Sequence, residues 1–210
     1  MSYPVVFQAD YREQQSRLTT FFRLLVAIPW FLVSIVWGLL AFIGVVVAWF
    51  ALLVTGRYPQ FAYDWVAQYL RFSTRVNGWV FLMTDEWPPF DGAEHPEYPI
   101  RLLVAEPLDE YSRWKVLLRV ILAIPVMIMV YIFNLLIELI GILLWIVIVV
   151  TGKAPRGLWD IQKLGIAYSA RGSAYYLLVT ETYPPISADD GDALPPSATA
   201  PPASSSPFGG

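Results

Sequence analysis

Residues 24–54 read LLVAIPWFLVSIVWGLLAFIGVVVAWFALLV, and residues 120–150 read VILAIPVMIMVYIFNLLIELIGILLWIVIVV. Each stretch is 31 residues long, and together they contain a single charged residue, Glu138. Roughly 18 consecutive apolar residues are enough to indicate a transmembrane helix. The composition agrees, because 57% of the 210 residues are hydrophobic and only 15% are charged. The sequence therefore predicts an integral membrane protein.

The length of these stretches leaves two geometries open. A straight helix of this length would measure about 46 Å, whereas the hydrocarbon core of a bilayer is about 30 Å thick. In the first geometry, each helix kinks at Pro29 or Pro125 and crosses the membrane once, so that the two stretches run in opposite directions. In the second, each stretch folds into a helical hairpin, with its tip near Gly38 or near residues 134–138.

The distribution of basic residues favours the hairpins. Single spans would leave seven Lys and Arg residues between the two stretches and seven outside them, and the positive-inside rule would then favour neither orientation. Hairpins place all 14 on one side of the membrane. We therefore expect a multi-pass or re-entrant protein of the cell membrane, with cytoplasmic flanking loops and a cytoplasmic tail.

The two apolar stretches belong to a repeat that aligns without gaps over most of its length at an offset of 96 residues. Self-similarity of this kind indicates two copies of one structural unit. We place the first membrane unit at residues 1–95 and the second at residues 96–187, and we predict that the Pro-, Ser- and Ala-rich residues 188–210 form a disordered tail. The matched positions include Arg23 and Arg119, Trp49 and Trp145, Gly56 and Gly152, Arg75 and Arg171, and the closing motifs TDEWPP (84–89) and TETYPP (180–185).

Two further elements complete each unit. Each opens with a short β-prone stretch, YPVVF at residues 3–7 or YPIRL at residues 98–102, which we interpret as an extended arm. An amphipathic segment follows each apolar stretch, at residues 61–83 and more weakly at residues 157–179, and its pattern suits the headgroup plane of a membrane. The predicted fold is all-α and membrane-integral, with two tandem repeats that each contain an extended arm, a long apolar helix or helical hairpin, and an amphipathic interfacial helix.

The recurring pattern is R-x4-IP-x19-W-x5-TG-[RK]-x-P-x15-R-x8-T-[DE]-x-[WY]-PP. A chain with this pattern resembles the membrane module called domain-of-unknown-function family 4389. The resemblance covers about residues 1–187, and the tandem arrangement is similar to that of actinobacterial members. It implies a small helical membrane domain and assigns no activity to any residue.

The charged residues of the repeat suggest structural and lipid-binding roles. Arg57, Arg71 and Arg75, with Lys153 and Arg171 in the second unit, are candidates for binding lipid headgroups. Asp64 and Asp160 recur at matched positions, and we expect them to form structural ion pairs with Arg57 or Lys153, or between the units. The TG[RK]xP turns are predicted to end helices, because Gly favours the left-handed cap and Pro prevents continuation.

Glu138 is the one carboxylate within an apolar stretch, and such residues usually face protein or water. In a single-span helix it would share a face with Asn134 and form an intramembrane polar site. In a hairpin it would lie at the wet tip.

The sequence argues against catalysis. It contains no Cys and one histidine, His95, without an H-x-x-x-H pair or a GxSxG motif, so we expect no catalytic residue, no metal site and no cofactor. No basic patch is dense enough for nucleic acid. The leading hypothesis is a non-enzymatic scaffold or accessory module in a membrane, cell-envelope or lipid-handling complex, with membrane lipids, other membrane proteins or a second copy as partners. The alternatives are a small transporter or channel with Glu138 on its path, and a lipid-binding protein.

Overall fold

The computed structural model describes residues 3–187, so the tail predicted at residues 188–210 lies outside the described residues. Six helices and two strands follow the two-unit order of the sequence within this range. They are β1 (Val5–Ala9), α1 (Arg17–Val26), α2 (Ile28–Thr55), α3 (Gln60–Val80), β2 (Ile100–Val104), α4 (Arg113–Leu117), α5 (Arg119–Thr151) and α6 (Arg156–Tyr176).

The two apolar stretches form continuous helices, so the predicted hairpins are wrong. Helix α2 has 28 residues and α5 has 33, and both are long and apolar enough to cross a membrane. Gly38 and Asn134, which were expected at hairpin tips, lie inside these helices. Both face a neighbouring helix. A Cβ atom at Gly38 would lie 3.7 Å from the ring of Tyr69 on α3, and Asn134 accepts a 3.0 Å hydrogen bond from Ser169 on α6.

The two prolines are accommodated in different ways. Pro29 occupies the first turn of α2, where its missing N–H would have no partner within the helix. Pro125 lies inside α5, whose helical assignment continues on both sides of it.

The two extended arms pair with each other and form an antiparallel two-stranded sheet, so the fold is mostly helical and the all-α prediction needs correction. Phe7 pairs with Leu102, and these are the corresponding positions of YPVVF and YPIRL. Repeated segments that pair antiparallel at equivalent residues are related by a local two-fold axis through that pair. Each arm therefore binds the other unit. The similarity of the two arm sequences does not by itself show this pairing.

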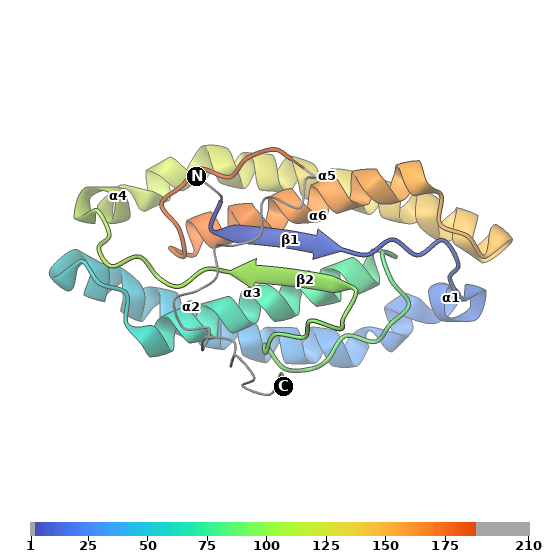
Figure 1. Ribbon diagram of the computed structural model, residues 1–210, viewed down its shortest axis with the longest axis horizontal. Coiled ribbons are helices and arrows are strands. Elements are labelled where there is room, and N and C mark those ends of the chain that lie inside the picture. The colour runs from blue at the N-terminus through green and yellow to red at the C-terminus, as the bar shows by residue number, and fades with distance from the viewer. Residues whose placement is uncertain (1–2, 188–210) are drawn as a thin grey trace, which may run out of the picture.

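Figure 1 shows the arrangement around this axis. Helices α3 and α6 lie in the middle, α2 and α5 lie outside them, and the sheet covers α3 and α6 on one face. Helices α2 and α5 run in opposite directions along the long axis of the molecule. The N-terminal helix α1 packs against α5, and α4 packs against α2, so the units are interlocked at both ends.

The amphipathic segments lie in the interior of the fold instead of at a free membrane surface. On α3, the aromatic face packs against α2, where Phe72 and Trp79 cluster with Trp30. The polar face is also covered, because Arg75 is only 3% exposed beneath the chain that follows α3. The interfacial position predicted for these helices is therefore wrong.

Glycines allow α5 and α6 to pack closely. A Cβ atom at Gly172 would lie 2.3 Å from Val130 Cγ2, and one at Gly165 would lie 2.6 Å from Ile137 Cγ1. Contacts this short require the neighbouring side chain to move. Gly157, on the same helix, has no neighbouring atom within 4 Å of an added Cβ.

We predict that Gly172→Leu lowers the free energy of unfolding by about 1–3 kcal/mol, because the added side chain overfills the contact between α5 and α6. Thermal unfolding of the purified protein in a mild detergent would measure this effect. Gly157→Leu is the matched control and should leave the unfolding temperature unchanged or slightly higher, because Leu favours helix more than Gly does. Equal effects of the two substitutions would contradict the packing described here.

Candidate functional site

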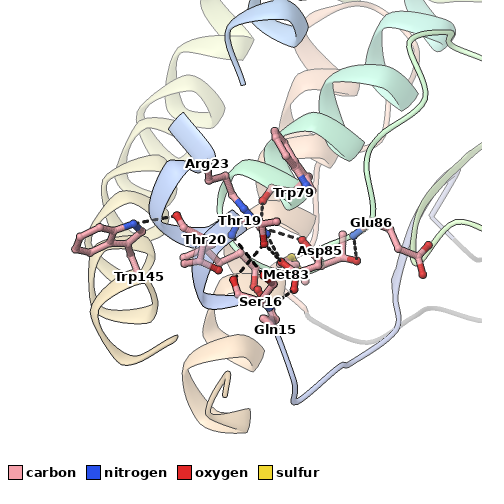
Figure 2. A network of polar contacts seen from close by, with 12 residues as sticks. Gln15, Ser16, Thr19, Thr20, Arg23, Trp79, Met83, Asp85, Glu86 and Trp145 are labelled. Carbon is pink, nitrogen blue, oxygen red and sulfur yellow. Dashed lines mark hydrogen bonds and ion pairs between the residues drawn. The ribbon is translucent and has the colours of Figure 1, made fainter. Parts of the chain in front are cut away.

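Arg23 is the centre of a buried polar junction between α1 and the end of α3 (Figure 2). Its side chain is 2% exposed. Nη1 donates hydrogen bonds to the carbonyl oxygens of Trp79, at 2.6 Å, and Thr84, at 2.9 Å, while Nη2 forms an ion pair with Asp85. The guanidinium also lies over the Trp79 ring, 5.2 Å from its centroid. These contacts determine where the chain leaves α3.

Burial lowers the pKa of the Arg23 guanidinium from its ordinary value, and the adjacent Asp85 carboxylate opposes this shift. A buried cation without such a partner is strongly destabilising. Arg23 therefore needs Asp85 as its counter-ion. Both Nη atoms of Arg23 already have protein partners.

Asp85 also organises the start of α1. It accepts a 2.5 Å hydrogen bond from the backbone N–H of Ser16 and a 3.4 Å hydrogen bond from the Thr19 hydroxyl. Gln15 donates to the carbonyl of Leu82 at 2.7 Å, and Leu82 has a φ of 67°, which is uncommon for a residue other than Gly. Arg23, Asp85 and Gln15 thus hold a tight exit from α3 in place.

The second unit contains a related junction, in which Arg119 has no ion pair among the described residues and Glu181 instead pairs with Lys115 at 3.2 Å. Arg119 is 4% exposed, donates to the carbonyl of Thr180 at 3.0 Å, and lies 4.3 Å from the ring centroid of Tyr175. Glu181 accepts from the Ser112 backbone N–H at 2.7 Å, as Asp85 does from Ser16. Sequence analysis missed this role of the closing motif. The signal was present, because Arg23 and Asp85 are 62 residues apart and Arg119 and Glu181 have the same separation.

The TG turns end α2 and α5 as predicted, with Gly56 and Gly152 in left-handed cap conformations at φ of 73° and 75°. Each turn is also bound by the other unit. The Gly56 carbonyl accepts from Tyr111 N–H at 2.9 Å, and the Gly152 carbonyl accepts from Gln15 N–H at 3.0 Å. These turns are therefore part of the contact between the units.

The charged residues that follow the two TG turns have different surroundings. Lys153 pairs with Glu13 at 2.8 Å, whereas Arg57 is exposed at the end of α2. The ion pairs expected for the two aspartates are not the ones found. Asp160 pairs with Arg156 at 3.0 Å, and Asp64 accepts from Gln60 at 2.9 Å, since residues four positions apart on a helix face each other.

The basic candidates do not form one site. Arg71 and Arg75 line a cavity of about 400 Å³ together with Arg101, which sequence analysis did not select. Each of the three already binds an oxygen group, which weakens the case for an anion site. Arg71 pairs with Glu94 at 2.7 Å, Arg75 donates to the Asp91 carbonyl at 2.9 Å, and Arg101 binds both carboxylate oxygens of Asp10.

Arg171, the counterpart of Arg75, lies in the second unit and donates to the carbonyl of Ser187 at 2.7 Å. It therefore binds the segment that follows α6, much as Arg75 binds the segment that follows α3.

His95 also lines the cavity of Arg71 and Arg75, and it lies between two carboxylates. One ring nitrogen is 2.8 Å from Asp91 Oδ1, and the other is 3.0 Å from Glu97 Oε1. Hydrogen bonds to Asp91 and Glu97 raise the pKa of His95 above its ordinary value of 6.5. Among residues 3–187, no group of three or more His, Cys, Asp or Glu side chains could hold a metal ion.

The two residues predicted to form an intramembrane polar site lie on the same groove. Asn134 and Glu138 on α5 line a groove of about 500 Å³ that also contains Ser169 of α6 and Asn77 of α3. The groove runs between the two middle helices. Its lining combines these polar side chains with apolar ones such as Leu24 and Phe31.

A family model described as "Domain of unknown function (DUF4389)" matches residues 17–91 and again residues 113–188. The chain belongs to this family. The predicted resemblance and its two-copy form are thereby confirmed. No similar curated protein and no similar solved structure was found. The two DUF4389 matches include Arg23 and Arg119, both closing motifs and both TG turns.

We predict that Asp85→Asn lowers the free energy of unfolding by about 3 kcal/mol, because the substitution leaves the buried Arg23 cation without its counter-charge. Thermal unfolding in detergent would measure the loss. Asp109→Asn removes the same charge from an exposed position and is the control. A loss no larger than that of the control would show that the junction does not stabilise the fold.

His95 provides a prediction of pH dependence. Because its pKa is raised on folding, its contribution to stability should be fully present below pH 6.5 and lost as the pH rises through the folded-state pKa. His95→Gln should therefore reduce the unfolding temperature at about pH 5.5 and have less effect at about pH 8. As the single histidine, His95 also gives one imidazole signal for NMR titration. A measured pKa of His95 at or below 6.5 would show that its contacts with Asp91 and Glu97 do not stabilise the charged ring.

Proposed function

We propose that this chain is a non-enzymatic membrane module that lies in the plane of the membrane. Its apolar helical face would enter one leaflet, and its sheet face would remain in water, where an accessory role in a larger complex would be exercised. The observation that carries this proposal is the distribution of exposed apolar side chains, which gather on α1, α2, α4 and α5.

Most of the surface of the apolar helices is not covered by the protein itself. In the most apolar 18-residue segment of each helix, only 17% is buried in α2 and 28% in α5. On α2, Leu39 and Phe42 are 59% and 65% exposed, and on α5 Leu139 is 59% exposed. A contiguous apolar surface of this kind marks contact with lipid or another protein.

The sheet face argues against helices that cross the membrane. The strands run along the same long axis as α2 and α5 (Figure 1), so helices that spanned the bilayer would carry the sheet through it as well. Charged groups such as Asp10, Glu94 and Arg101 would then lie at membrane depth, beside an open two-stranded sheet. Lipid does not tolerate such an edge, because its backbone groups would lack hydrogen bonds.

The in-plane orientation also agrees with the basic residues. The local two-fold axis passes through the Phe7–Leu102 pair and would stand normal to the membrane, so both units would face it in the same way. The charged turns at both ends could then lie on one side. The hairpins were favoured because they place all Lys and Arg on one side of the membrane. The in-plane orientation gives the same one-sided distribution with continuous helices.

The repeated features support an accessory role over a catalytic one. The duplicated arginine junctions and the TG turns both hold backbone segments in place, so the features that the two units repeat are structural ones. Together, the two units form one apolar face with a polar face opposite to it.

Cysteine accessibility tests the orientation, because the chain has no Cys of its own. Arg57 and Lys153 follow the matching turns at opposite ends of the molecule (Figure 1). In sealed vesicles, we expect Arg57→Cys and Lys153→Cys to react with a membrane-impermeant thiol reagent from the same side. Leu39→Cys, in the middle of α2, should be protected until detergent is added.

Reaction of Arg57→Cys and Lys153→Cys from opposite sides would refute the in-plane orientation. That result would instead favour inverted units that cross the membrane, which is the arrangement of many transporters.

A further inference from the structure

The groove between α3 and α6 combines polar groups with apolar walls. It lies on the side of α3 that carries Ser73 and Asn77, away from Gly78, whose position faces Ile100 of β2. Leu24 and Phe31 of the N-terminal helices form part of its wall. The groove therefore lies on the side of the middle helices opposite to the sheet.

The groove holds one carboxylate, Glu138, which only accepts hydrogen bonds, beside amide and hydroxyl groups that can donate or accept. Within residues 3–187, the side chains of Glu138 and Asn77 have no hydrogen bond or ion pair. Asn134 accepts a hydrogen bond from Ser169, and its oxygen retains a second lone pair. One carboxylate and no Lys or Arg line the groove, so its charge favours a cation.

An apolar cavity continues from the same carboxylate. It measures about 350 Å³, shares Glu138, Leu24 and Phe81 with the groove, and extends to Ile142 and Trp145. Arg23 borders this cavity, but its Nη atoms are bound by Trp79, Thr84 and Asp85, as described above. Glu138 thus lies where the polar groove meets the apolar cavity.

The repeat shows that Glu138 is not needed for the fold. At the corresponding positions the first unit has Phe42 in place of Glu138 and Gly38 in place of Asn134, yet it forms the same helix pair. By contrast, the second unit retains a hydroxyl, Ser169, at the position of Ser73. A carboxylate that departs from the repeat on an exposed apolar helix is costly and needs a partner.

We propose that the groove binds the primary ammonium group of an amphiphile, with Glu138 as the counter-ion and with the apolar chain in the adjoining cavity. A primary ammonium has three donors and requires several acceptors, which Glu138, Asn134 and Asn77 supply. An anionic amphiphile would find no cation in the groove. A quaternary ammonium carries the same charge but no N–H donor, so it distinguishes hydrogen bonding from charge alone.

Binding is tested with dodecylamine and the full chain in an uncharged detergent, by isothermal titration calorimetry. We expect saturable binding that Glu138→Gln weakens about tenfold or more, the effect of losing a charge-assisted hydrogen bond. Glu110→Gln, which makes the same substitution at an exposed position outside the groove, should bind as the unaltered chain does. Dodecyltrimethylammonium should bind more weakly than dodecylamine to the unaltered chain.

Equal dodecylamine affinity in Glu138→Gln and the unaltered chain would overturn the proposal, as would equal affinity for the two ammonium compounds. A change of oligomeric state in Glu138→Gln, without a change in amine binding, would assign the groove to a second copy and would also overturn it. Because the assay uses detergent, its outcome does not depend on how the protein lies in a membrane.

Native mass spectrometry then separates two sources of the ammonium group. Retention of phosphatidylethanolamine, but not phosphatidylcholine, after exposure to mixed vesicles would identify an aminophospholipid. Retention of dodecylamine alone would identify a simple long-chain amine. Loss of the retained molecule in Glu138→Gln is expected in either case, and retention by that variant would refute the site.

Discussion

The buried guanidinium groups of Arg23 and Arg119 are the constraint on which the rest of the fold depends. Each needs hydrogen-bond acceptors, because a buried guanidinium left without partners is strongly unfavourable. The available partners are carbonyls at the end of the middle helix and, for Arg23, the carboxylate of Asp85. This requirement fixes the exit of the chain from α3 and α6, and with it the segments that cover those helices.

The same constraint explains why two units form one body. The turns after α2 and α5 receive hydrogen bonds from Tyr111 and Gln15, and each of these residues belongs to the other unit. The strands are likewise shared. A single unit would leave the Gly56 carbonyl and the edge of its strand without these partners, so tandem duplication within the chain supplies contacts that one copy lacks. The interlocked ends shown in Figure 1 are the visible result.

Sequence analysis predicted the repeat, the ends of α2 and α5, and the shared face of Asn134 and Glu138, because each follows from a local pattern of residues. It failed where the answer depended on a contact distant in the chain. Gly38 and Asn134 suggested hairpin tips, but they are small or polar because α3 and α6 pack against them. The aromatic and arginine faces of α3 suggested a membrane surface, but protein covers both. Spacing within one segment does not show which partner covers a face.

The two copies provide a way to separate fold from function within a single chain. Residues that both units share, such as Arg23 and Arg119, are explained by the contacts that build the unit. Glu138 is different, because its counterpart is Phe42 and both units form the same helix pair. A residue that the fold does not require, and that carries a charge on an apolar helix, must be offset by something outside the repeat. If the proposed amine site exists, its specificity therefore comes from the second unit, since the first has no carboxylate at the corresponding position.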